Sequence, residues 1–430
     1  MTASRITAVR GRRIWDSRGR PTVEVDIHTE SGTFGRAIAP AGASTGSGEA
    51  LDRRDGGDAF GGMDVTAAIA SVNGEIAKAL AGRDAADQAG IDRALIALDG
   101  TPGKSRLGGN AVVATSMAVA HAAAAARRMP LWQSLAEGRA CRLPLPEIQI
   151  FGGGAHAGRR VDVQDFMVIA TGAQTFAEAL DWTAEVYRAA GRLMSEAGLL
   201  QGVADEGGFW PAFDTNEQAL DMLLRAIEKA GYRPGEQVAI SLDIASSEFG
   251  RGGFYDLKRM KGGPVRLDSG GMIELLGGWL GRYPIVAIED PLAEDDGDGL
   301  VKFTQAHGRR VEIVGDDFLV TSAERLKAAA ARGACNTALI KPNQAGTLTE
   351  AKAAFEAAKT AGYGAIVSAR SGESEDTTIV HLAVGWGCDQ LKVGSITRSE
   401  RNAKWNEGLR VAEAAGMGTL PPRSAFVWGR

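Results

Sequence analysis

The chain has 430 residues, of which 44% are apolar and 23% are charged, a balance typical of globular proteins rather than disordered or membrane ones. This length exceeds what one hydrophobic core usually holds, so two domains are expected. The net charge of -5 excludes an extended nucleic-acid-binding surface, because a phosphate backbone requires a clustered excess of lysine and arginine.

Residues 1–13 are polar and basic and contain no apolar stretch of the kind a secretory signal has, so we expect a cytoplasmic protein. The most apolar run, 111–126, is rich in alanine and interrupted by polar residues, which predicts a buried helix and no membrane partner. Three widely spaced cysteines without a C-x-x-C pair indicate reduced thiols: Cys141, Cys335 and Cys388.

The N-terminal part predicts strands followed by helices. A turn at 16–21 leads into residues 22–27, which alternate strictly between apolar and polar side chains and so predict an antiparallel meander. A loop rich in glycine and alanine follows at 40–46, and helical patterns then run through 64–126. We expect a small α+β domain over residues 1–135.

The stretch 143–146 reads Leu-Pro-Leu-Pro and predicts a linker, because proline restricts both itself and the residue before it. Beyond it, over 143–430, short apolar runs alternate with longer helical patterns. Repeated units of this kind predict a parallel sheet, most simply a barrel. The expected strands are 237–242, 284–288, 311–314, 337–340, 364–367 and 390–393.

Each expected strand ends in or contains a charged residue, and the carboxyl ends of barrel strands share one face. Any one of these charges is more simply explained as a side chain that leaves the sheet for solvent. Six in register are harder to explain that way, so we predict that they converge on one site. They are Asp243, Glu289, Asp316, Lys341, Arg370 and Lys392.

Three carboxylates without nearby histidine or cysteine predict a hard-oxygen metal site that suits Mg²⁺ or Mn²⁺, with Mg²⁺ the expected ion. Lys341 and Lys392 would face the same cation, which favours the neutral amine that can accept a proton. Removing a proton next to a carboxylate creates an enolate, and a divalent metal on the carboxylate oxygens stabilises it.

The chain resembles enolase over essentially its whole length. No single motif is decisive, but their order and spacing together are specific. The matching motifs are DSRG at 16–19, PTVEVD at 21–26, GASTG at 42–46, LDGT at 98–101, DEGGF at 205–209, SEF at 247–249, IEDPLAEDD at 288–296, GDD at 315–317, RSGE at 370–373 and RSER at 398–401.

The resemblance implies an enolase-type C-terminal α/β barrel, similar to a TIM barrel, with the smaller α+β domain before it. It also implies a small anionic phosphate or phosphonate substrate and a homodimer or higher homo-oligomer. One or two Mg²⁺ ions are expected, and the implied ligands are Asp243, Glu289 and Asp316.

The resemblance further assigns roles around the substrate, following a known pattern in which a lysine base works beside one or two Mg²⁺ ions. Lys341 matches the base at C2, Glu206 the acid that helps hydroxide leave C3, and His156 a histidine on a flexible loop. Substrate-binding roles fall to Arg370 and Ser371 for the phosphate, Lys392 for the carboxylate, and Gln164.

The sequence departs from the family pattern at the site itself. Ala41 replaces a serine whose hydroxyl helps hold the second Mg²⁺, so only a backbone carbonyl would remain there. Asp165 replaces a catalytic glutamate and withdraws the carboxylate by about 1 Å, a shift that catalysis can feel. Ala369 replaces a histidine near the leaving group. Arg159 and Arg160 are additions, interpreted either as solvated surface or as contacts for an extra anion in the substrate.

Three functions are therefore weighed. The first is a hydro-lyase that eliminates water from 2-phosphoglycerate or a close phosphorus-containing analogue to give an enolpyruvate product. The second is an enzyme of phosphonate natural-product biosynthesis similar to carboxyphosphonoenolpyruvate synthase, favoured by the two arginines and by Ala369. The third is a non-catalytic binding protein, which predicts drift at the metal ligands and lysines that the sequence does not show.

Overall fold

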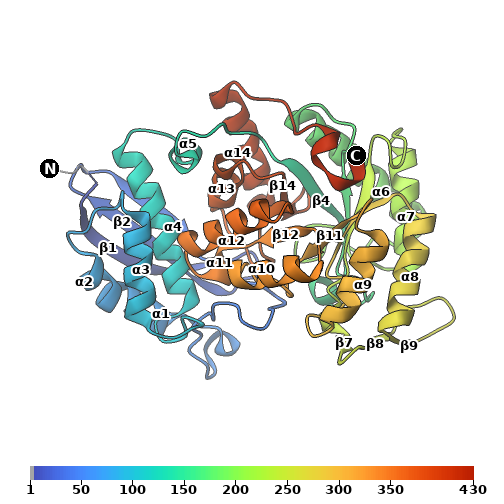
Figure 1. Ribbon diagram of the computed structural model, residues 1–430, viewed down its shortest axis with the longest axis horizontal. Helices are drawn as coiled ribbons and strands as arrows, with labels where there is room; N and C mark the ends of the chain where they lie inside the picture. Colours follow the sequence, from blue (N-terminus) through green and yellow to red (C-terminus); the bar gives the residue numbers. More distant parts are fainter. Residues whose placement is uncertain (1–3) are drawn as a thin grey trace.

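The computed structural model describes residues 4–430 and begins with a three-stranded antiparallel sheet at one end of the molecule (Figure 1). Its strands lie in chain order and are β1 (Ile6–Trp15), β2 (Pro21–Thr29) and β3 (Phe34–Ile38). The turn between β1 and β2 forms because the Asp16 carboxylate accepts the backbone N–H groups of Arg18 at 2.8 Å and Arg20 at 2.9 Å. The predicted meander is confirmed.

Helices cover one face of this sheet. They are the short η1 (Ala59–Gly62), α1 (Thr66–Ser71), the π-helical turn η2 (Val72–Ile76), α2 (Ala77–Leu80), α3 (Gln88–Asp99) and α4 (Gly109–Ala126). The chain reverses after α3 at Gly100, whose φ of 72° is left-handed and suits glycine. The helical stretch expected over 64–126 is therefore interrupted between α3 and α4.

Helix α4 is the apolar run that the sequence predicts to be a buried helix. Within residues 4–430 it is the one helix long and apolar enough to cross a membrane, but 83% of it is buried inside the protein. It packs against β2 and β3. Its approach to β3 requires Gly35, because a Cβ there would lie 2.1 Å from the backbone nitrogen of Ala122 and 2.3 Å from the carbonyl oxygen of Ala118.

The second part of the chain is a closed eight-stranded barrel surrounded by helices (Figure 1). The strands follow the order β10–β11–β12–β13–β14–β4–β5–β6 around the barrel. Their bounds are β4 (Leu145–Gly152), β5 (Asp165–Ile169), β6 (Ala239–Asp243), β10 (Ile285–Glu289), β11 (Glu312–Gly315), β12 (Thr337–Ile340), β13 (Gly364–Ser368) and β14 (Gln390–Gly394).

All six predicted strands exist, but two aspects of the prediction are wrong. Strand β5 runs antiparallel to both β4 and β6, so the barrel is not fully parallel. The predicted linker is shorter than expected, because Leu145 and Pro146 already pair with β14. Pro146 is tolerated because an extended strand accommodates its fixed φ, and it is the second residue of β4, at the start of the pairing.

The outer helices are α6 (Phe176–Glu196), α7 (Asn216–Lys229), α8 (Ser269–Arg282), α9 (Gly297–His307), α10 (Ala323–Arg332), the short α11 (Pro342–Ala345), α12 (Leu348–Thr360), α13 (Thr378–Trp386) and α14 (Ser399–Ala415). Several begin where a side-chain oxygen accepts a free N–H group of the first turn, as Thr175 does for α6 and Thr347 for α12. Helix α5 (Leu131–Ala136) joins the two parts by packing against α13.

Short elements close the remaining sides. A small antiparallel sheet of β7 (Gly250–Arg251), β8 (Phe254–Leu257) and β9 (Val265–Asp268) follows β6, and short 3-10 helices occur at η3 (Gly154–Ala157), η4 (Ser246–Glu248), η5 (Arg423–Ala425) and η6 (Val427–Gly429). Near the C-terminus, Phe426 packs with Leu145, Ile169 and Ala287, residues at the amino-terminal end of the barrel. This C-terminal segment therefore leaves the carboxyl ends of the parallel strands uncovered.

We predict that Gly35→Ala destabilises the protein by about 3 kcal/mol, because the added methyl group meets the rigid backbone of α4. Gly278→Ala is the matched control: it lies in α8 with nothing within 4 Å of the added carbon, and should stabilise by about 1 kcal/mol. Urea unfolding measures both changes. Equal unfolding midpoints for the two variants would contradict the close packing of β3 on α4.

Candidate active site

The barrel brings the six predicted charges to one mouth. Asp243 and Glu289 are the last residues of β6 and β10, while Asp316 and Lys341 directly follow β11 and β12. All of these side chains are buried, as are those of Arg370 and Lys392. The interpretation of each charge as a solvent-exposed strand end is therefore wrong, and the predicted convergence is correct.

Lys392 lies among the carboxylates. Its Nζ donates to Glu289 Oε2 at 2.7 Å and to Asp243 Oδ2 at 3.1 Å, and lies 3.6 Å from Asp165 Oδ2. The contact with Asp165 is possible because β5 is antiparallel, which places its first residue at the same end as the last residue of β6. One ammonium group thus offsets part of the charge of three buried carboxylates.

Lys341 pairs with the third predicted metal ligand. Its Nζ donates to Asp316 Oδ2 at 2.5 Å, and Gln344 Nε2 donates to Asp316 Oδ1 at 2.9 Å. Lys341 lies in the N-cap of α11, so Gln344 follows it by one helical turn. This spacing fixes the carboxylate from both sides and holds the amine at the cavity wall.

The prediction that a positive environment lowers the lysine pKa values is not met by the protein's own charges. Burial is the largest single influence on the pKa of Lys341 and lowers it, but the surrounding carboxylates, Asp316 foremost, together raise it more, and the net direction is upward. The pKa of Lys392 is also raised, because the surrounding carboxylates, Asp243 and Glu289 foremost, together outweigh burial. Carboxylates therefore dominate the local potential, and a divalent cation among them would act in the opposite direction.

The three predicted ligands fit a hard cation such as Mg²⁺. Glu289 Oε1 is buried without a hydrogen-bond partner, and burial together with the Asp243 charge raises the Glu289 pKa well above its usual value. A buried carboxylate oxygen that accepts no hydrogen bond is stabilised by a bound cation. Gln164 contributes a further buried, unpartnered oxygen beside Asp243, which accepts its Nε2 at 3.1 Å.

A second group of carboxylates lies behind this one and has a structural explanation. Asp290, Asp316 and Asp317 approach one another closely. The Asp290 carboxylate accepts the backbone N–H groups of Asp316 at 2.9 Å and Asp317 at 2.8 Å. Asp290 therefore orients the loop that presents Asp316, and it does so from outside the cavity.

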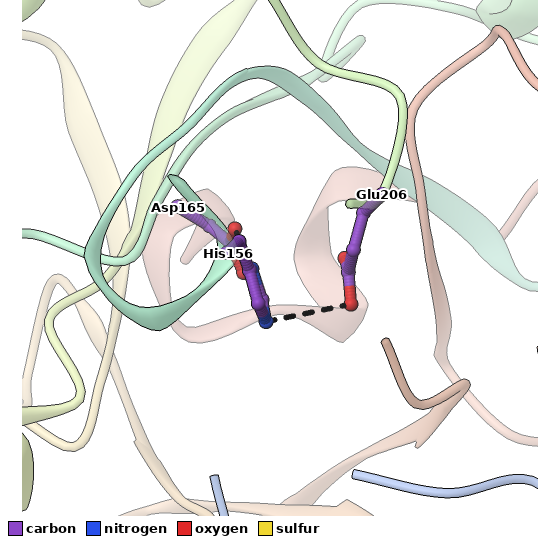
Figure 2. Close-up of side chains that lie close together, drawn as sticks. All are labelled: His156, Asp165 and Glu206. Carbon is purple, nitrogen blue, oxygen red and sulfur yellow. Dashed lines mark hydrogen bonds and ion pairs between the residues drawn. The ribbon is translucent and has the colours of Figure 1, made fainter. Parts of the chain in front are cut away.

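His156, Asp165 and Glu206 form a compact cluster on the other side of the mouth (Figure 2). His156 lies in η3, and its Nδ1 is 3.0 Å from Asp165 Oδ1, while its Nε2 points toward Glu206 Oε1 at 3.8 Å. Burial alone would lower the His156 pKa, but the charges of Asp165 and Glu206 raise it to about 9. The imidazole is thus a buried cation held between two carboxylates.

The predicted anion-binding residues lie after β13. Arg370 is oriented by a buried ion pair with Glu49 at 2.8 Å and by Asn343 Oδ1 at 3.1 Å. Arg401, buried in α14, donates to the carbonyl oxygens of Arg370 and Ser371 and so fixes the backbone that carries both side chains. This contact explains the RSER motif, which has a supporting role.

One small polar cavity connects these groups. It is lined by Gly42, Ala43, Ser44, His156, Gln164, Glu206, Asp243, Lys341, Ser368, Ala369, Arg370, Ser371, Lys392 and Val393. Predicted residues from seven separate segments therefore meet at one place. Ala369 lines this cavity together with Glu206, and its methyl group stands where the resemblance implies a histidine.

The structure does not bring Arg159 and Arg160 into the cavity, so their prediction as substrate-binding residues is corrected. The Arg159 side chain is 68% exposed and pairs with Glu248 at 2.6 Å, and Arg160 pairs with Asp214 at 3.3 Å. Each guanidinium is directed to a neighbouring loop because a carboxylate is available there. The interpretation as solvated surface charge is the better one.

Three supporting residues were missed in the sequence. Gln149 on β4 donates to Asp165 and accepts the N–H group of Gly208 at 2.8 Å; Glu49 pairs with Arg370; and Gln344 holds Asp316. A signal existed for Gln344, three residues after Lys341 at the start of a helix. Glu49 and Gln149 gave none, because their roles depend on contacts across the fold.

Comparison with known protein families gives two matches. The family model described as "Enolase, N-terminal domain" matches residues 6–135, and that described as "Enolase, C-terminal TIM barrel domain" matches residues 140–420. Together they cover nearly the whole chain, in the order of the two parts of the fold.

The His156 cluster predicts a specific pH dependence. Its pKa of about 9 lies above the ordinary 6.5, so protonated His156 stabilises the fold below about pH 6.5, and this stabilisation is lost as the pH rises through 9. Asp165→Asn should lower the pKa because it removes the closest negative charge, and Glu206→Gln should lower it less. Nitrogen-15 NMR of the imidazole measures both, and a charged His156 at pH 8 in Asp165→Asn would contradict the pairing.

Proposed function

The chain belongs to the enolase family, and we propose on this basis that it is a Mg²⁺-dependent hydro-lyase. In this proposal it removes the C2 proton and eliminates water from 2-phosphoglycerate or a close phosphorus-containing analogue, giving an enolpyruvate product. The observation that carries the proposal is a single cavity lined by Lys341, by Glu206 with its histidine, by Arg370 and by the potential metal ligand Asp243, with the carboxylates of Glu289 and Asp316 next to its two lysines.

The strand order supports the separation of base and acid. Lys341 follows β12, which is four strands from β5 in either direction around the eight-stranded barrel. Asp165 starts β5 and binds His156, which approaches Glu206. A substrate between the two sides would offer one face of its carbon chain to Lys341 and the other to Glu206. Removal of a proton and departure of hydroxide from opposite faces suits this arrangement.

Lys341 is the proposed base. Its amine reaches the cavity and is positioned by Asp316, which Gln344 holds in turn. Asp243, Glu289 and Asp316 would hold Mg²⁺, which supplies positive charge to the substrate carboxylate as negative charge develops there. That same charge offsets the Asp316 carboxylate and favours the neutral form of the amine, the form that accepts the C2 proton.

Glu206 is the proposed donor of the proton that departs with the C3 hydroxyl. The protonated His156 lies 3.8 Å from it and is kept charged by Asp165, so the imidazolium can stabilise the carboxylate that Glu206 becomes once it has given up its proton. The Asp165 side chain is one methylene shorter than that of glutamate, and its carboxylate lies 3.0 Å from the His156 imidazole.

Arg370 and Ser371 are the residues proposed to bind the phosphorus group of the substrate. The guanidinium is oriented by Glu49 before substrate arrives, so little side-chain entropy is lost on binding. The guanidinium charge suits phosphate and phosphonate oxygens alike. The site therefore supports a phosphorus-containing anion as a class.

The two other functions are now unequally supported. The analogue from phosphonate biosynthesis loses the argument from Arg159 and Arg160, which pair with Glu248 and Asp214, and keeps the argument from Ala369 in the cavity wall. A non-catalytic role would leave a cluster of buried charges without benefit, although such burial costs several kcal/mol per ion. The intact cluster favours catalysis.

We predict that Lys341→Ala lowers kcat for 2-phosphoglycerate by about a hundredfold to ten-thousandfold, since a positioned base contributes 10²–10⁴-fold. Lys327→Ala is the control. That lysine is exposed on α10, so the substitution removes the same kind of side chain at a position away from the cavity. Formation of phosphoenolpyruvate is followed by absorbance. Equal turnover in the two variants would exclude Lys341 as the base.

Mg²⁺ should raise the thermal unfolding midpoint of the wild-type protein, and the rise should grow with the Mg²⁺ concentration. The reason is that a ligand that binds only the folded state stabilises that state. Glu289→Gln removes a charged ligand and should abolish most of that rise. Glu324→Gln, an exposed carboxylate on α10, is the control that should keep it. A full Mg²⁺ shift in Glu289→Gln would place the ion elsewhere.

A further inference from the structure

Gln149 is a fully buried residue of β4 to which the mechanism above gives no role. Its Nε2 donates to Asp165 Oδ1, the oxygen that also lies 3.0 Å from His156 Nδ1. Its Oε1 accepts the backbone N–H group of Gly208 at 2.8 Å, two residues after Glu206. One amide therefore joins the carboxylate that pairs with His156 to the turn that carries Glu206.

The turn that carries Glu206 approaches Gln149 closely because residue 208 is glycine. A Cβ at Gly208 would lie 2.5 Å from Gln149 Oε1, which is too short for a non-bonded contact. The same turn is fastened to β4 by the Phe209 N–H group, which donates to the carbonyl oxygen of Ile150 at 2.8 Å. The second glycine of the DEGGF motif thus admits the Gln149 amide to the turn.

Asp165 has two cations within reach. Its Oδ1 contacts His156 and Gln149, whereas its Oδ2 is buried and, among residues 4–430, accepts no hydrogen bond. Oδ2 lies 3.6 Å from Lys392 Nζ, an ammonium group with three N–H donors, of which the metal-site carboxylates accept two. A small rotation of the Asp165 carboxylate would therefore exchange the imidazole for the ammonium group.

An amide suits position 149 because it offers a donor and an acceptor at once. The donor meets a carboxylate and the acceptor meets a backbone N–H group, so both contacts are made without adding charge to the cluster. A carboxylate at this position would repel Asp165, and an ammonium group would leave the Gly208 N–H group without an acceptor.

We propose that Gln149 is a positioning residue that keeps the Asp165 carboxylate on His156. Without it the carboxylate turns to Lys392, and the turn that carries Glu206 loses its tie to the imidazole pair. The three side chains that Gln149 organises lie together in Figure 2. The inference rests on the proposed function for the role of Glu206 as proton donor, whereas the control of the Asp165 carboxylate stands on the contacts alone.

The first test follows the side-chain amide of Gln149 and the imidazole of His156 by nitrogen-15 NMR of the wild-type protein as the pH is raised. Because both groups contact the same oxygen, the amide signal should shift with the same midpoint as the imidazole, near the His156 pKa of about 9. This measurement requires neither metal nor substrate. An amide signal that stays constant while the imidazole titrates would overturn the inference.

The second test compares two substitutions by the same NMR measurement. Gln149→Met removes both contacts at similar volume and should lower the His156 pKa from about 9 to about 8, a tenfold change in imidazole protonation that matches the loss of about one hydrogen bond. Gln133→Met is the matched control, since Gln133 is exposed on α5. An unchanged His156 pKa in folded Gln149→Met would overturn the inference.

The third test measures turnover of 2-phosphoglycerate with Mg²⁺. Gln149→Met should lower kcat by about tenfold to a hundredfold, because a small misplacement of a catalytic group costs up to that much. KM should change by less than about twofold, because Glu206 acts on the leaving group and not in binding. A rise in KM with unchanged kcat would overturn the positioning role. No turnover by wild-type protein that gives both expected NMR results would instead overturn the proposed function and leave the control of Asp165 intact.

Discussion

The structure depends on a balance of buried charge at the open end of the barrel. Asp243, Glu289 and Asp316 are brought together by three neighbouring strands, and the ammonium groups of Lys392 and Lys341 contact them at 2.5 to 3.1 Å. Ions in such an interior cost several kcal/mol each unless they are paired. The site therefore holds together only as a set of paired charges.

The antiparallel strand β5 gives the site its second side. It turns the start of the strand toward the mouth, so that Asp165 faces Lys392 and also binds His156 at 3.0 Å. Because η3 carries His156 and the segment around Glu206 packs against it, the proposed proton-delivering groups form one unit. The proposed base and the proposed acid are consequently built on different parts of the barrel.

Much of this arrangement follows from the sequence, because strands that end in charges must converge when they close a barrel. The convergence of the three carboxylates and the two lysines was predictable from that rule, and the six strands were predictable from their apolar runs. The direction of β5 was not, since an apolar run of five residues carries no sign of its orientation. The lysine pKa directions and the pairing of Arg159 with Glu248 were also out of reach, because they depend on which carboxylate lies nearest in space. The same holds for Gln149, whose contacts with Asp165 and Gly208 join separate segments of the fold.

The central claim is that Lys341 and the metal site remove the C2 proton. The most direct measurement is exchange of the C2 hydrogen of 2-phosphoglycerate in heavy water with Mg²⁺, followed by proton NMR. The account predicts exchange that requires Mg²⁺ and proceeds whether or not water is eliminated, because base and acid lie on separate sides of the cavity. Absence of exchange in folded, metal-loaded protein that binds the substrate would contradict it.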